Sequence, residues 1–214
     1  MDIQLAKIIK KYPSFFHIIQ NALPAAYKRA QAQMNEMLYD DLCRQRMGYF
    51  ILTNADHTLR HDFENIAFDG VEVYSAPNAN RSNLHLEIRT PYAIFMVAKV
   101  SAPNAVPPKA QYRQKYSDQV FMAEVFPEYE LFSEASIPLY IVTHTFHKGD
   151  YLPKSIHVGR LSMDQRTWEY NVPIEMLCKN ELLIENIEKE NVPIVQEEIA
   201  SRKNRIKIKT KEII

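Results

Sequence analysis

The chain has 214 residues, of which 46% are hydrophobic and 24% charged, and its formal net charge is zero. These values are typical of a globular domain, and they exclude a protein that binds polyanions through its bulk charge. No stretch approaches the roughly 18 uninterrupted apolar residues that a membrane-spanning helix needs, so we expect a cytoplasmic protein without a membrane partner.

Two helices are predicted at the N-terminus. Residues 2–20 carry apolar side chains at helical spacing, and Pro13 is expected to kink or split this helix. The segment has no continuous apolar core and no small-residue cleavage site, which argues against a signal peptide. Pro24 suits the first turn of a second helix over residues 25–46. Residues 53–70 are polar and are expected to be irregular.

The most informative stretch covers residues 84–100. Leu84, Leu86 and Ile88 alternate with His85, Glu87 and Arg89, which predicts a strand with one apolar and one ionisable face. The run from Tyr92 to Ala98 is apolar throughout, which favours a buried strand covered on both faces. A further strand is predicted over residues 71–75, after a turn at Asp69-Gly70.

The rest of the chain adds one helix and three strands to this pattern. Residues 101–110 contain three prolines and are expected to be a loop, and residues 111–133 are predicted to be helical. Strands are predicted over residues 139–146, 156–161 and 167–172. We therefore expect an α+β fold in which an N-terminal helical pair packs on a mixed or antiparallel sheet of five to six strands. This single domain is expected to cover residues 1–180.

Residues 181–214 form a charged C-terminal appendage. Its first part, 181–198, has six Glu and one Lys, and its second part, 202–211, has six basic residues and no acid. The basic part could contact phosphates of a nucleic acid, or the acidic part could neutralise it. The residues expected at such a contact are Arg202, Lys203, Arg205, Lys207 and Lys209.

Several classes of site are disfavoured by composition. The four glycines are scattered, so no loop resembles the Gly-rich phosphate cradles of nucleotide-binding proteins. Cys43 and Cys178 are far apart and are expected to be buried thiols in a reducing compartment. His57 and His61 have the spacing of a zinc pair on a helix, but no third ligand is evident and the segment is not expected to be helical.

The candidate catalytic residues are Glu87, Lys99 and His144. His144 is expected to be a satisfied histidine in or near the core, with a general base at the strand end as the alternative. The row of His85, Glu87 and Arg89 is expected to be a solvated sheet face, or else Glu87 and Lys99 belong to a metal-dependent site in which a carboxylate holds Mg²⁺.

The order of helix, three strands, helix and strand over about residues 25–146 resembles the core of PD-(D/E)XK nucleases. That family carries acid-x-Lys on its third core strand, where this chain has Val97-Ala98-Lys99. The resemblance implies Mg²⁺ held by Glu87, with Asp69 as a possible second carboxylate. Because Val97 replaces the acid, the sequence fits a degenerate relative better than an active nuclease.

No nucleophile or catalytic motif is recognisable in the chain, so we expect an intracellular, non-catalytic binding protein without a cofactor or a metal site. Its first expected partner is another protein, and its second is nucleic acid through the basic tail. The alternative is a metal-dependent PD-(D/E)XK-like nuclease or phosphodiesterase, active or degenerate, which would use Mg²⁺.

Overall fold

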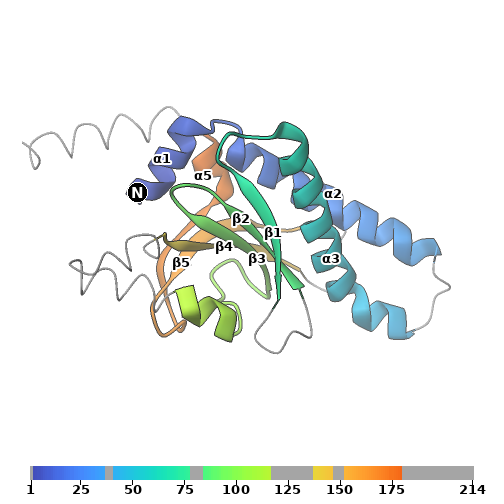
Figure 1. The fold of residues 1–214 in the computed structure, drawn as a ribbon. Helices are drawn as coiled ribbons and strands as arrows, with labels where there is room; N and C mark the ends of the chain where they lie inside the picture. Colours follow the sequence, from blue (N-terminus) through green and yellow to red (C-terminus); the bar gives the residue numbers. More distant parts are fainter. Residues whose placement is uncertain (1, 37–40, 78–83, 117–136, 147–151, 180–214) are drawn as a thin grey trace, which may run out of the picture.

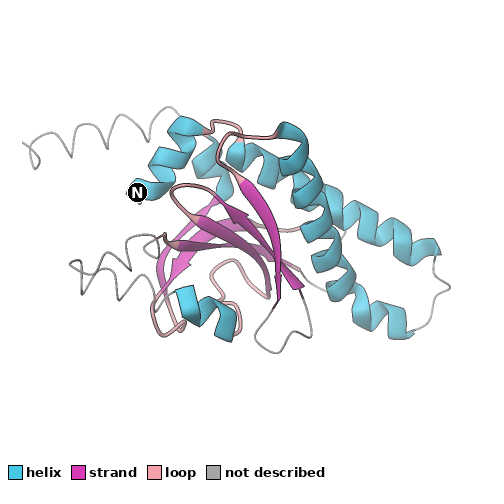
Figure 2. Ribbon diagram, in the orientation of Figure 1, coloured by secondary structure: helices cyan, strands magenta, loops and turns pink. Residues whose placement is uncertain are grey.

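The computed structural model describes residues 2–36, 41–77, 84–116, 137–146 and 152–179. They form three layers, in which one sheet lies between helices on both sides (Figure 1). Helices α1, α2, α3 and α5 cover one face, and a helical segment at residues 111–116 covers the other. Figure 2 shows the same layers by secondary structure. The predicted α+β class is confirmed.

Three N-terminal helices pack on the sheet, where the sequence predicted two. They are α1 (Ile3–Lys11), α2 (Phe15–Glu36) and α3 (Asp41–Ile66). The expected helix boundaries were wrong at Pro24, which lies inside α2 rather than at its start. Its neighbours Leu23 and Ala26 are fully buried, so core packing outweighs the helix hydrogen bond that proline removes.

Helix α3 also corrects the expectation that residues 53–70 are irregular, because it continues to Ile66. Its polar side chains obscured a narrow buried stripe at every fourth position, which runs through Ile51, Ala55, Leu59 and Phe63. The helix is followed by Ala67, which has a positive φ of 50°, and by a turn in which Gly70 has a φ of 74°. This turn leads directly into the first strand.

The sheet has six strands in the order β1-β2-β3-β4-β5-β6. Strands β3 and β4 are parallel, and every other neighbouring pair is antiparallel, so the sheet is mixed. The strands are β1 (Glu72–Pro77), β2 (Leu84–Arg89), β3 (Ile94–Val100), β4 (Leu139–Thr145), β5 (Ile156–Leu161) and β6 (Trp168–Pro173). Each strand falls close to its predicted position.

Strand β3 is buried on both faces, as its apolar run predicted. On the side of the helices, Phe95 packs against Phe15 of α2 with ring centroids 4.9 Å apart. On the other side, Met96 belongs to a second apolar cluster that contacts Tyr112 and Tyr116 of the 111–116 segment. The predicted helix over residues 111–133 is confirmed as far as residue 116, and its remainder lies outside the described residues.

The described chain ends with a short helix that the sequence did not predict, α5 (Ile174–Cys178). Ile174 and Leu177 of this helix are buried in the core on the side of α1 and α2. Cys178 is a free, partly buried thiol, while the side chain of Cys43 lies outside the described residues. Residues 181–214 also lie outside them. None of the described helices is long and apolar enough to cross a membrane.

Candidate functional site

The ionisable row of β2 lies on the sheet face that looks away from α2 and α3. Leu86 and Ile88 point into the helix-facing core, so the alternation of a strand places His85, Glu87 and Arg89 on the opposite face. This face is not solvated as expected, because Glu87 is only 1% exposed. His85, Glu87 and Arg89 therefore form a polar cluster around a buried carboxylate, and not the solvated sheet face that the sequence predicted.

Glu87 accepts hydrogen bonds from three side chains. His85 Nε2 lies 3.0 Å from Oε1, and Arg89 donates to Oε2 from Nε at 3.0 Å and from Nη2 at 2.6 Å. The hydroxyl of Tyr116 lies 2.9 Å from Oε1 and 3.0 Å from Oε2. Burial raises the pKa of Glu87, but the hydrogen bonds from His85, Arg89 and Tyr116 outweigh burial and lower the pKa to about 2.

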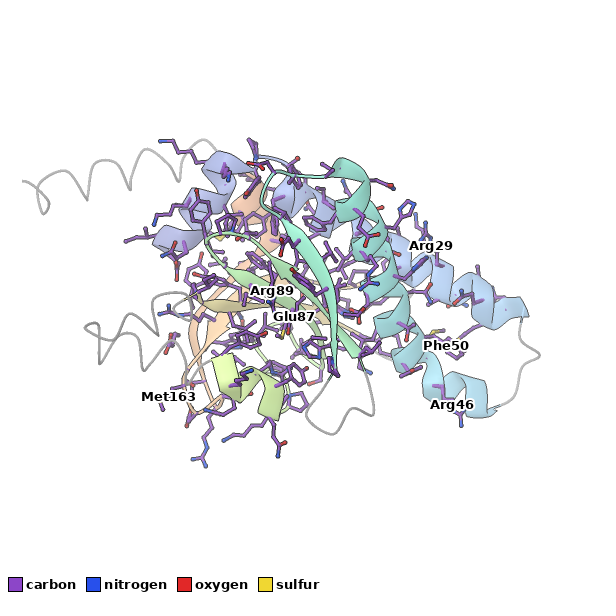
Figure 3. All side chains as sticks on the ribbon, viewed as in Figure 1. Arg29, Arg46, Phe50, Glu87, Arg89 and Met163 are labelled. Atoms are coloured by element: carbon purple, nitrogen blue, oxygen red, sulfur yellow. The ribbon has the colours of Figure 1, made fainter. Side chains whose placement is uncertain are left out.

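Aromatic rings hold the two basic members of this cluster in place. The ring of Tyr112 stacks on His85 with a centroid distance of 4.1 Å, and the Arg89 guanidinium lies 4.8 Å from the ring centre of Tyr74. Figure 3 shows Glu87 and Arg89 next to each other in the middle of the sheet. The cluster therefore has a buried carboxylate at its centre, while the Arg89 side chain remains 42% exposed.

Lys99 does not belong to this cluster. Glu87 pairs with Met96 across β2 and β3, and Lys99 is three residues beyond Met96, so its side chain points to the opposite face. There the Lys99 ammonium lies against Gly48 of α3 and 5.2 Å from the ring centre of Phe146. The structure therefore does not bring together Glu87 and Lys99, which a nuclease site would require.

Asp69, the possible second carboxylate, is also remote from Glu87. It lies in the turn before β1, where its backbone carbonyl accepts a hydrogen bond from the Tyr12 hydroxyl at 2.7 Å. Its side chain is fully exposed and lies 3.9 Å from the ammonium of Lys11. Asp69 therefore takes part in the contact with the N-terminal helices rather than in the polar cluster.

Lys99 and His144 do lie side by side, as register partners on the parallel strands β3 and β4. His144 is fully buried, and its Nδ1 lies 2.8 Å from the hydroxyl of Tyr27, which donates to the carbonyl of Thr145. The Nδ1 atom is therefore the protonated nitrogen. Burial and the nearby charge of Lys99 lower the pKa of His144 to about 4, so it is a neutral core residue.

A break in the sheet adds one residue that sequence reasoning missed. Strands β2 and β3 pair only from Glu87↔Met96 to Arg89↔Ile94, although β3 stays paired with β4 along its full length. This residue is Asp56 of α3, whose carboxylate interacts with the backbone N–H of Leu86, where the pairing of β2 with β3 stops. Burial raises the pKa of Asp56 to about 7, and His85, Leu86 and Arg60 partly offset the effect.

The remaining candidate residues are exposed or lie outside the described ranges. His57 and His61 are exposed on α3, where their spacing does place them on one helix face. Within the described ranges, no group of three or more His, Cys, Asp and Glu side chains has the geometry to hold a metal ion. The basic residues expected to contact nucleic acid, Arg202, Lys203, Arg205, Lys207 and Lys209, lie outside the described ranges.

Comparison with family models, curated proteins and solved structures finds no match to this chain.

Proposed function

We propose that this chain is a non-catalytic binding protein. The observation that carries the proposal is the saturation of Glu87, whose two carboxylate oxygens accept hydrogen bonds from His85, Arg89 and Tyr116. A catalytic carboxylate needs an oxygen free to hold a metal ion or to exchange a proton with substrate. The arrangement of Glu87 supports a structural role for the residue that would otherwise be the leading catalytic candidate.

The proposed partner is another protein, and strand β1 is the proposed contact. This outer strand pairs with β2 alone among the described strands, and four of its six residues are exposed. Tyr74 on β1 is 42% exposed, and Leu84 on the neighbouring strand is 65% exposed. An open strand edge beside apolar side chains suits an extended partner segment, which would add main-chain hydrogen bonds to the sheet.

Nucleic acid is the second proposed partner, through the basic residues between Arg202 and Lys209. This part of the proposal is supported by the charge of the sequence alone. Binding should weaken steeply with salt, because each phosphate contact releases counterions. A duplex titrated at low and at moderate salt, against the full chain and against a chain ending at residue 199, tests this contact. Equal affinity of the two chains would remove the tail from the proposal.

The alternative function is a metal-dependent phosphodiesterase, and one experiment distinguishes it from a binding protein. The full chain is incubated with duplex DNA, single-stranded DNA and RNA in Mg²⁺ or Mn²⁺, beside the Glu87→Gln and Lys99→Met variants. We expect no metal-dependent cleavage that depends on either residue. Cleavage by the parent that disappears in both variants would overturn the non-catalytic proposal.

A further inference from the structure

We propose that the exposed face of α1 binds the acidic segment of this same chain, residues 181–198, through Lys7 and Lys11. These two residues are called the α1 lysines below. The acidic segment has two possible targets within the chain, and the proposal assigns it to α1 rather than to the basic residues 202–211. This contact goes beyond the proposed binding function and does not depend on it.

Helix α1 buries one face in the core and presents the α1 lysines to solvent on the other. The helix contains no acidic residue. A cation near the end of a helix interacts favourably with the helix dipole, which gives a local reason for Lys11 in the last turn. Lys7 is one turn earlier, and it forms no ion pair within the described ranges. The charge of Lys7 is therefore available to an anion from elsewhere.

The ring of Tyr92 brings the two ammonium groups to one place. Lys7 Nζ lies 5.8 Å and Lys11 Nζ lies 6.0 Å from the centre of this ring, as in cation–π contacts. Asp69 lies 3.9 Å from Lys11 Nζ, but its side chain is fully exposed, and an exposed ion pair of this kind is weak. Two cations beside one ring thus face a single solvated carboxylate, which leaves a local excess of positive charge.

The charge balance of the chain favours an acidic segment of its own as the occupant. The full chain has 26 basic and 26 acidic residues, whereas its described residues contain 17 Lys and Arg against 12 Asp and Glu. The acidic excess therefore lies in the rest of the sequence, where residues 181–198 hold six Glu against one Lys. A second acidic stretch, 118–134, follows Tyr116, which packs on the opposite face of the sheet from α1.

The acidic segment also starts on the same side of the sheet as α1. It follows α5, whose Ile174 and Leu177 belong to the same core cluster as Leu5 and Ile8 of α1. Figure 1 shows α5 and α1 at the same end of the helical layer. Ten extended residues span up to about 35 Å, so the segment is long enough to reach the α1 lysines. Because it is tethered, its effective concentration there is about millimolar, which favours it over a free polyanion.

The test is carbodiimide cross-linking of the full chain, which joins a lysine amine to a nearby carboxyl group as an amide, followed by mass spectrometry of the monomer. Lys109 and Lys115 are internal controls, because both are exposed on the other side of the sheet. We expect the α1 lysines to cross-link to residues 181–198 about tenfold more than the controls do at low salt. This excess should disappear between about 0.01 and about 1 M salt, because the Debye length falls from about 30 to about 3 Å.

Two variants separate the effect of charge from that of proximity, and both are read at Lys10, which stays unchanged. Lys7→Gln/Lys11→Gln removes two charges and is expected to reduce the cross-link from Lys10 to the acidic segment severalfold. Lys7→Arg/Lys11→Arg keeps both charges and is expected to keep that cross-link. Cross-links of the acidic segment mainly to lysines of residues 202–211, equal yields at the α1 lysines and the controls, or an unchanged Lys10 yield in the Gln variant would each overturn the proposal. If the Gln variant does not fold, the parental yields at the two salt concentrations decide the outcome.

Discussion

Arg89 and Glu87 stand two residues apart on β2, and Arg89 Nε and Nη2 both donate to Glu87 Oε2, at 3.0 and 2.6 Å. Glu87 is 1% exposed, so this charge pair replaces water around a buried carboxylate. Removing Arg89 would leave the buried carboxylate of Glu87 without its charged partner, whereas the Arg89 side chain itself is 42% exposed. The cluster is therefore expected to be sensitive to single substitutions.

The Glu87→Gln variant is expected to lower the free energy of unfolding by about 3 kcal/mol at pH 7. The amide is uncharged, and its NH₂ group would face the donors of Arg89 and Tyr116 instead of accepting from them. Urea denaturation of parent and variant measures the difference. Glu64→Gln is the control, because Glu64 lies on the exposed surface of α3. An effect of Glu87→Gln no larger than that of the control would contradict this account.

The ionised carboxylate of Glu87 should also make the stability of the protein sensitive to acid. Since the pKa of Glu87 is lowered from 4.5 to about 2 in the folded protein, its contribution is complete above pH 4.5 and is lost as the pH falls towards 2. The stability difference between the parent and Glu87→Gln should therefore shrink across this window. Denaturation curves at pH 5, 4 and 3 follow the change, and a difference that stays constant would exclude the proposed ionisation.

Replacing Tyr27 by Phe is expected to destabilise the protein by about 1–3 kcal/mol. The Tyr27 hydroxyl links His144 Nδ1 to the carbonyl of Thr145, and both groups are buried, so its removal leaves polar atoms without a partner. Thermal unfolding of Tyr27→Phe measures the loss. The control is Tyr49→Phe, because Tyr49 is 64% exposed. Equal melting temperatures of the two variants would show that the buried hydroxyl contributes nothing.

The lowered pKa of His144 leads to a second prediction about how stability depends on pH. Its pKa is lowered from 6.5 to about 4, so the unfolded chain binds a proton more readily than the folded one between these values. Stability should fall by up to about 3 kcal/mol as the pH drops from 6.5 to 4. His144→Gln removes this component, so the parent should lose stability faster than the variant. His57→Gln should keep the parental slope, and parallel slopes for all three proteins would refute the assignment.

Two glycines should respond in opposite ways to alanine. A Cβ at Gly159 would lie 2.6 Å from the backbone oxygen of Tyr170 and 2.7 Å from the ring of Trp168, so Gly159→Ala is expected to cost about 1–3 kcal/mol. A Cβ at Gly48 would meet only the flexible end of Lys99, and alanine is the better helix former. Gly48→Ala is therefore expected to be neutral or stabilising by up to about 1 kcal/mol. Denaturation midpoints of both variants test the contrast.

The strands and their faces could be predicted from the sequence because side-chain alternation is a local property. Leu86 and Ile88 faced the core as expected, and β3 was buried on both sides. Helix α3 was predicted only in part, because its buried apolar stripe is one residue wide, includes the small Ala55, and lies beside the buried polar residues Asn54 and Thr58. An apolar stripe this narrow identifies a buried helix face only when the surface that packs against it is known. The local sequence does not contain that information.

The candidate site depended on contacts between distant parts of the chain. The alternation put His85, Glu87 and Arg89 on one face, but Tyr116, which is 29 residues beyond Glu87, shields that face and binds its carboxylate. The register of β2 against β3 decided that Lys99 points away from Glu87. The sequence thus determined which side chains share a face, because that follows from backbone geometry along one strand. Only the tertiary structure decided which face is covered and by what, because burial and hydrogen bonding depend on segments that meet in space.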